Sequence, residues 1–150
     1  MAQVAATFEV PLGWERFEWE GTLGGLRHRA ATGNFHPNVL VTLDKWPGQV
    51  GPAKAEEILT AQLRTAGAEV SGTETFNEPR PGVEVATLQR DEAGASVRVR
   101  YLLQLLDAGE DTLVLTAVAT CMLDQADAIE GDITSILRSV ELTTSATRDA

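Results

Sequence analysis

Cysteine and histidine are scarce in this chain of 150 residues. The single cysteine, Cys121, lies in an apolar run, so no internal disulfide can form and we expect a packed core thiol. The two histidines, His28 and His36, show no zinc-ligand spacing, and Arg27 and Arg29 flank His28 with positive charge. These features exclude a disulfide framework and predict that the chain holds no structural metal.

Basic residues are also few, because 12 lysines and arginines stand against 22 acidic residues and give a net charge of -10. Such a field repels nucleic-acid phosphates and anionic lipids, so we expect no nucleic-acid partner. No stretch approaches the roughly 20 apolar residues of a membrane span, so we expect no membrane insertion. Residues 1–6 lack a basic region and a long apolar run, which predicts a soluble cytoplasmic protein.

Catalytic and cofactor motifs are missing as well. The sequence has no Gly-x-Ser-x-Gly, and the glycines of residues 21–25 are not followed by Lys-Ser or Lys-Thr. Four acidic residues around a helix near residue 130 lack the spacing of a calcium loop and are typical of helix capping and a solvated face. We therefore predict a protein that is not an enzyme and has no cofactor. An enzyme with a dispersed site stays as an alternative, and it predicts a deep polar pocket near His28 or His36.

Apolar residues are what the chain has in a clear pattern. Two strongly apolar strands are predicted at residues 96–106 and 112–122, joined by a turn at 107–111. An amphipathic helix is predicted at 126–140, with Asp124 as its N-cap. A second amphipathic helix is predicted at 52–66.

Further short strands are predicted at residues 7–11, 39–43, 69–76 and 83–89. Because helices do not alternate with every strand, a doubly wound parallel sheet is disfavoured. The expected fold is α+β, an antiparallel β-sheet with two amphipathic helices packed on one face. We expect a single domain over residues 1–142, followed by a small polar tail at 143–150 that frays.

The predicted hairpin is apolar on both faces at the end nearest its turn. A sheet covered on one side alternates more cleanly, so something must cover part of the second face. The residues that define this candidate partner surface are Leu102, Leu106, Val114 and Val118. A loop carrying a tryptophan would cover it equally well, as would a second copy of the chain or a ligand.

Two smaller groups of residues are further candidates. Trp14, Trp19 and Trp46 could line a cleft for a small apolar ligand, or they could anchor loops and the core without any ligand. Arg98 and Arg100 share one strand face and could contact an anion, or they could pair across strands with Glu84 or other carboxylates.

Short motifs give a family resemblance. Residues 8–14 (Phe-Glu-Val-Pro-Leu-Gly-Trp) and 34–42 (Asn-Phe-His-Pro-Asn-Val-Leu-Val-Thr), with the order of elements over residues 6–142, resemble the Mog1/PsbP-like group. More narrowly, they are similar to the actinobacterial LpqN/LpqT lipoprotein family. The resemblance implies an αβα sandwich around an antiparallel sheet. The leader and lipidated cysteine of those lipoproteins are missing here, which favours a cytoplasmic member.

Members of the wider group are mostly non-enzymatic, and the resemblance therefore implies a binding function. With the doubly apolar hairpin, it predicts a non-catalytic protein-binding domain that acts as an adaptor or chaperone, with a homodimer as one form of the partnership. The alternative from another class is a carrier of a small apolar ligand, using the tryptophan-lined cleft.

Overall fold

The computed structural model describes residues 2–30, 35–78 and 80–146. Asn34, the first residue of the second family-like motif, lies outside them. Within the described residues the chain forms nine strands, a 3-10 helix and two α-helices. In chain order these are β1 (Ala2–Thr7), β2 (Trp14–Phe17), β3 (Gly24–His28), β4 (Asn38–Pro47), α1 (Pro52–Thr65), β5 (Glu69–Phe76), β6 (Gly82–Arg90), β7 (Ser96–Ala108), β8 (Asp111–Met122), η1 (Leu123–Gln125), α2 (Ala126–Ser139) and β9 (Glu141–Ala146).

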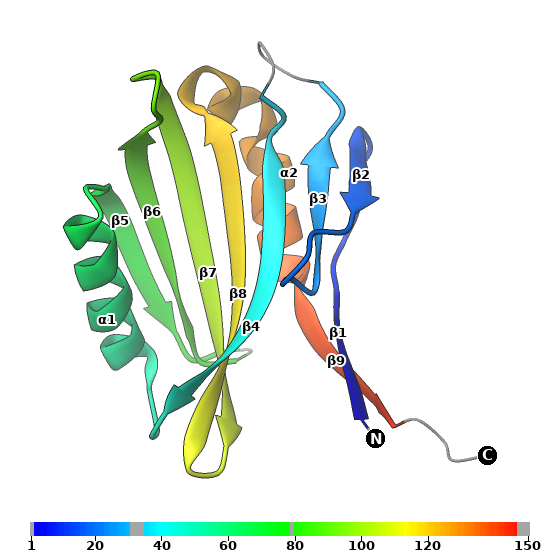
Figure 1. Ribbon diagram of the computed structural model, residues 1–150, viewed down its shortest axis with the longest axis vertical. Coiled ribbons are helices and arrows are strands. Elements are labelled where there is room, and N and C mark those ends of the chain that lie inside the picture. The colour runs from blue at the N-terminus through cyan, green and yellow to red at the C-terminus, as the bar shows by residue number, and fades with distance from the viewer. Residues whose placement is uncertain (1, 31–34, 79, 147–150) are drawn as a thin grey trace.

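Seven of the described strands form one antiparallel sheet in the order β2-β3-β4-β8-β7-β6-β5. The long β7–β8 hairpin lies near its centre, as the apolar pattern predicts (Figure 1). This antiparallel sheet with its helices confirms the predicted α+β class.

The remaining strands, β1 and β9, pair antiparallel with each other and extend away from the large sheet (Figure 1). This ribbon corrects the expected end of the ordered domain. Residues 143–150 were expected to fray, yet residues 143–146 pair with the first part of β1, with Ala146 opposite Ala2, while residues 147–150 lie outside the described residues. The chain order hides this partner because the two strands come from opposite ends of the sequence.

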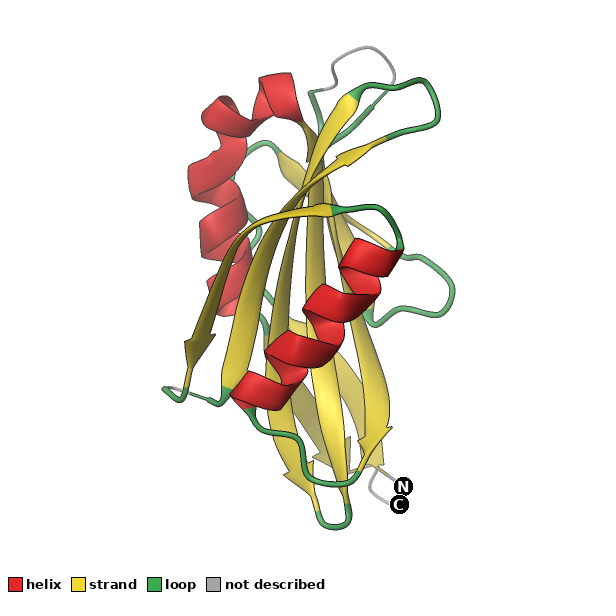
Figure 2. Ribbon diagram, turned by 90° about the vertical axis from the view of Figure 1, so that its left-hand side faces the viewer, coloured by secondary structure: helices red, strands yellow, loops and turns green. Residues whose placement is uncertain are grey.

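The two α-helices pack on opposite faces of the sheet, with the strands between them (Figure 2). Alternate residues of β7 belong to different cores: Leu102 packs with α2, whereas Leu103 packs with α1. The αβα sandwich implied by the family resemblance is therefore present, and the expectation of two helices on one face is wrong. Each face of the β7–β8 hairpin is apolar because each face has a helix of its own.

The ends of the helices follow the local sequence in part. Pro52 occupies the first turn of α1, and Gly67, at a φ of +91°, follows its end. Asp124, expected to cap the second helix, is exposed and makes no capping bond in the described structure. Instead η1 leads into α2, and the side chain of Gln125 accepts a hydrogen bond from the backbone N–H of Met122 at 2.8 Å.

Strand boundaries differ most near the N-terminus. The strand predicted over residues 7–11 lies earlier in the structure, as β1, and Phe8 is buried just after it ends. The strand predicted over residues 39–43 continues to Pro47 as β4, because the neighbouring β8 pairs with it along its whole length. Sequence alternation alone could not show how far that pairing runs.

The width of the sheet sets up an uncovered region on each face. Strands lie about 4.8 Å apart, so seven span roughly 29 Å, whereas a helix with its side chains is about 10–12 Å across. In the described structure α1 packs mainly against β5 and β6, while α2 packs mainly against β8 on the other face. The face of β5 and β6 that points away from α1 is therefore left without a helix.

Among the described helices, none has both the length and the apolar character needed to cross a lipid bilayer.

Candidate binding groove

A groove of about 680 Å³ lies on the uncovered side of β5 and β6, next to the C-terminal end of α2. It is the candidate functional site, and we call it the acidic groove. Its walls come from β5, β6 and β7 on one side and from the end of α2 and the start of β9 on the other. The lining residues are Glu74, Phe76, Glu78, Arg80, Glu84, Leu102, Gln104, Arg138, Val140 and Glu141.

Side-chain contacts along β7 fix the position of α2 and thus one wall of the groove. Arg98 pairs with Glu130 near the start of the helix, with 2.8 Å between Nη2 and Oε1. Further along, Gln104 donates from Nε2 to the carbonyl oxygen of Val140 at 2.7 Å. These two contacts hold both ends of α2 against β7. The helix therefore lies over the centre of the sheet and leaves β5 and β6 uncovered.

The floor of the groove is apolar. Leu102 is 7% exposed and Val140 is 2% exposed, and both belong to the core beneath α2. Phe76 packs against the same core and lies directly opposite Gly82 on β6. A Cβ atom at position 82 would overlap the carbonyl oxygen of Leu103 and the ring of Phe76. The ring therefore occupies space that only a glycine leaves free.

The rim carries charge of both signs with an excess of glutamate. Glu84 is held by Arg100, whose Nε donates to Oε1 at 3.1 Å, so this carboxylate is already engaged. By contrast, Glu74, Glu78 and Glu141 form no salt bridge with any residue that the structure describes. Arg80 and Arg138 line the same rim and likewise form no salt bridge with any described residue, so its unpaired charges are three carboxylates and two guanidinium groups. A cationic group from another molecule can approach the carboxylates, which are in excess.

The four residues of the predicted partner surface do not lie together on one face of this molecule. Leu102 and Val114 are buried in different cores, beneath α2 and α1 respectively. Leu106 and Val118 are half-buried and also point to opposite faces, as the pairing of Leu106 with Leu113 and of Val118 with Tyr101 shows. The hairpin is apolar on its second face because α1 packs there, so these four residues do not form one continuous patch. Leu102 still contributes to the floor of the acidic groove.

The three tryptophans do not form a cleft. Trp14 is 3% exposed in the core beneath α2, where its Nε1 donates to Oδ2 of Asp132 at 3.0 Å. Trp46 packs against the core beneath α1, on the other face of the sheet. Trp19 is 62% exposed and meets Phe17 edge-on with 6.3 Å between ring centroids. The first two serve as anchors, which was the alternative interpretation.

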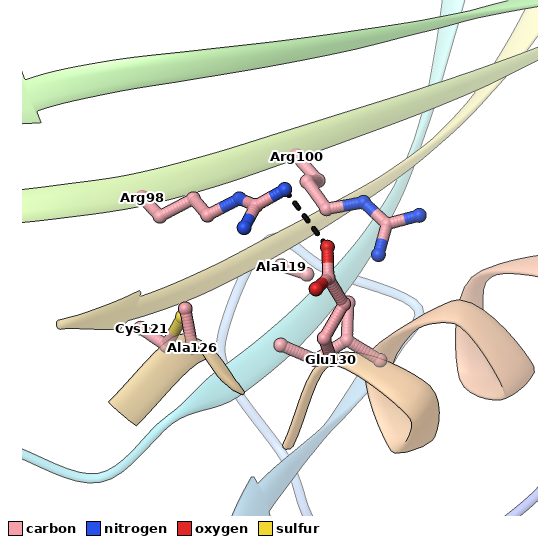
Figure 3. Close-up of a pocket in the computed structure, with 7 residues that line it drawn as sticks. Arg98, Arg100, Ala119, Cys121, Ala126 and Glu130 are labelled. Atoms are coloured by element: carbon pink, nitrogen blue, oxygen red, sulfur yellow. Dashed lines mark ion pairs between the residues drawn. The ribbon is translucent and has the colours of Figure 1, made fainter. Parts of the chain in front are cut away.

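The two arginines proposed to contact an anion are paired within the chain, and Figure 3 shows the ion pair of Arg98 with Glu130. Arg98 meets Glu130, and Arg100 meets Glu84 and also donates to Oγ1 of Thr134 at 2.8 Å. The cavity between them measures about 10 Å³, room for one water molecule at most. Cross-strand pairing with Glu84, the alternative interpretation, is therefore correct.

Cys121 lines the same small cavity and is 2% exposed, so the predicted packed thiol is confirmed. Burial is the main effect on this thiol and raises its pKa, although the nearby Arg98 opposes it. A thiol that resists ionisation is a poor nucleophile and a poor metal ligand.

The histidines lie away from the acidic groove. His28 packs edge-on against Trp14 at 5.2 Å between centroids, and its Nδ1 accepts from the backbone N–H of Ala30 at 3.1 Å. His36 lies within hydrogen-bonding distance of the carbonyl oxygen of His28 and lines a broad depression that is wide open to solvent. The dispersed-enzyme alternative predicted a deep polar pocket here, whereas this depression is wide open to solvent. Within the described residues, no three histidine, cysteine, aspartate or glutamate side chains form a metal-binding group.

Sequence reasoning missed the groove because no single segment encodes it. Its residues come from β5, β6, β7, α2 and β9, and the groove stays open because of where α2 crosses the sheet. One signal was present: residues 69–76 are extended but polar, with Glu69 and Glu74 among threonines and no lysine or arginine. A polar strand is typical of the edge of a sheet, which is where the structure places β5.

Several solved structures are similar to this one, and two of them are LpqN and CyanoP. LpqN, a protein involved in cell envelope biogenesis in Mycobacterium tuberculosis, superposes with a TM-score of 0.77 at 18% identity, over 95% of this chain and 85% of LpqN. The cyanobacterial PsbP protein CyanoP from Synechocystis sp. PCC 6803 gives a TM-score of 0.57 at 14% identity, over 95% and 92% of the two chains. No protein-family model and no curated protein matches the sequence. The Mog1/PsbP-like, LpqN-like fold expected from the short motifs is confirmed.

Proposed function

Starting from the fold shared with LpqN and CyanoP, we propose that this chain is a non-catalytic binding domain whose acidic groove receives a segment of a partner protein. The observation that carries the proposal is the composition of the groove. An apolar floor of Phe76, Leu102 and Val140 lies beneath a rim of charged side chains. Protein interfaces have this arrangement, with an apolar centre and a polar rim.

The charged rim favours a protein segment over a purely apolar ligand. Binding an alkyl chain or a ring alone would remove water from Glu74 and Glu141 without giving these carboxylates a partner, which costs free energy. A segment with a lysine or arginine beside an apolar side chain satisfies the rim and the floor together. The excess of negative charge on the whole chain also attracts such a segment from a distance.

Site-specific photo-crosslinking in the organism that encodes the chain tests this function. A photoreactive phenylalanine analogue is placed at Glu78 or Glu141 on the rim, and at Glu20 as an exposed control outside the groove. We expect the two rim positions to crosslink one common protein that the control position does not. Glu74→Lys should remove that crosslink. The same set of crosslinks at all three positions, or none from the rim, contradicts the function.

A carrier of a small ligand is the second candidate, and the size of the groove favours it. Pockets for small molecules measure about 300–1,000 Å³, and the acidic groove lies within this range at about 680 Å³. The tryptophans that were expected to contact an apolar ligand do not line this groove. Phe76 is the aromatic side chain in the groove that such a ligand would contact.

Native mass spectrometry of protein purified from its own host separates the two candidates. A carrier retains a small molecule that is lost in Phe76→Ala. A protein-binding domain gives the mass of the chain alone or of a complex with another chain.

A further inference from the structure

We propose that the partner segment binds as an added β-strand along the free edge of β5, with alternate side chains lying over the acidic groove. This inference rests on the proposed function, because it specifies how the groove and its partner meet. It also specifies the chemistry of the partner: an extended segment in which basic and apolar side chains lie on the same face. Extended peptides that join an exposed sheet edge are bound in this way in other folds.

The topology leaves β5 with one free edge. β5 is the last strand of the sheet, and among the described strands it pairs only with β6. All of its side chains are exposed except Val70 and Phe76, which are half-buried. Alternate backbone N–H and C=O groups of such an edge point outward, without a partner in the sheet.

The regular part of β5 lies beside the groove. The pairing of β5 with β6 shifts register between Val70 and Gly72, which marks a β-bulge near the start of the strand. From Gly72 to Phe76 the register is continuous. Glu74 and Phe76 share the face that lines the groove, because they pair with Glu84 and Gly82. A strand added here would place its own alternate side chains against these two residues.

Charge determines which strand this edge accepts. β5 carries Glu69 and Glu74, Glu78 follows it, and no lysine or arginine lies within the strand. Pairing with β5 of a second copy would bring the glutamates of two chains together, each chain with a net charge of -10. Bulges and charges of this kind protect edges from self-association. The same glutamates are complementary to a basic segment.

The probe is the heptapeptide Thr-Lys-Thr-Leu-Thr-Lys-Thr, which places lysine and leucine on one face and threonine on the other. Two derivatives carry N-methyl groups, one on the lysines and leucine and the other on the inner threonines. Only one of these two sets of N–H groups can point toward β5 in a paired strand. Binding to the full chain is measured by titration calorimetry, and amide hydrogen exchange is followed by NMR.

We expect the parent peptide to bind and to slow the exchange of amides within Glu69–Phe76. One N-methylated derivative should lose binding by about tenfold or more, while the other should keep it. Glu74→Lys should also weaken binding by about tenfold or more, because it places like charges together. Glu20→Lys, which changes the net charge equally at an exposed site outside the groove, should leave binding within about twofold.

Four results would overturn strand addition. Equal binding of both N-methylated derivatives would show capture by side chains alone. Unchanged exchange within β5 would place the peptide elsewhere, as would equal effects of Glu74→Lys and Glu20→Lys. Absence of binding by the parent peptide would show that the edge does not take this chemistry. None of these results removes the crosslinks expected from Glu78 and Glu141, which test the binding function separately.

Discussion

At the scale of single residues, Trp14 links two parts of the molecule that are distant in sequence. Its ring is buried between β2 and the core beneath α2, and its Nε1 donates to Asp132 on the helix at 3.0 Å. His28, opposite it on β3, packs against the ring edge-on. A buried indole N–H without an acceptor costs free energy, so this bond determines how the first hairpin meets α2.

We expect Asp132→Ala to lower the free energy of unfolding by about 1–3 kcal/mol, because it leaves the indole N–H of Trp14 without its acceptor. Ser135→Ala, at an exposed position of the same helix, is the matched control and should change it by less than about 0.5 kcal/mol. Urea denaturation followed by tryptophan fluorescence measures both. Equal stabilities of the two variants would show that the bond contributes nothing.

The thiol of Cys121 gives a prediction that depends on pH. Burial raises its pKa in the folded chain, so folding disfavours the thiolate. Stability linked to this group is therefore fully present below the pKa of the unfolded thiol, and it is lost as the pH rises from there through the raised pKa of the folded thiol. In native protein at neutral pH we expect an aromatic disulfide reagent to label Cys121 far more slowly than in protein unfolded in urea. Similar labelling rates in the two states would contradict the buried position.

At the scale of elements, both ends of the sheet use the same cross-strand pair. Phe17 on β2 lies opposite Gly25 on β3, and Phe76 on β5 lies opposite Gly82 on β6. In each pair a Cβ on the glycine would come within about 3.0 Å of the phenylalanine ring or closer. An aromatic ring over a glycine covers backbone that would otherwise be open to water, and so it stabilises an outer strand pair.

Gly82→Ala tests this arrangement at the groove. We expect a loss of about 1–3 kcal/mol in unfolding free energy, because the new methyl group displaces the Phe76 ring and meets the carbonyl oxygen of Leu103. Gly72→Ala on the adjacent strand is the control, since its Cβ would meet no atom within 4 Å. Thermal unfolding of the two variants measures the difference. If Gly82→Ala were as stable as Gly72→Ala, the close contact would have no energetic role.

The β1–β9 ribbon gives a prediction for the end of the chain. Ending the chain after Leu142 removes the partners of residues 2–5, so their amides should exchange as fast as those of an unpaired segment. Ending it after Ala146 keeps every pair and should leave exchange in β1 unchanged. Hydrogen exchange measured by NMR distinguishes the two truncations. Equal protection of β1 in both would show that β9 is dispensable for it.

At the scale of the whole molecule, the sequence predicts elements better than it predicts their assembly. Strong periodicity located α1, α2 and the β7–β8 hairpin because each buries an apolar stripe. The same residues could not show which face each helix covers. The apolar residues Leu102 and Val114 indicated that both faces of the hairpin are covered. They could not show what covers each face, because a helix and a partner protein require the same apolar residues on the strand. The groove depends on the crossing position of α2, which side-chain contacts such as that of Arg98 with Glu130 determine.

We expect the isolated chain to be monomeric at physiological salt, because its open sheet edge at β5 is acidic in every copy. Light scattering coupled to size exclusion measures this directly. A mass of two copies would contradict the prediction. Binding of the basic heptapeptide should weaken as salt rises, because salt screens the attraction between exposed charges.

The diagonal placement of the helices has one more consequence. The acidic groove occupies the face of β5 and β6 that α2 leaves open, while Leu40 and Val118 are half-buried on the opposite face, on β4 and β8. The full thickness of the sheet separates these two regions. Occupation of the groove would therefore leave the half-buried side chains of Leu40 and Val118 in contact with water.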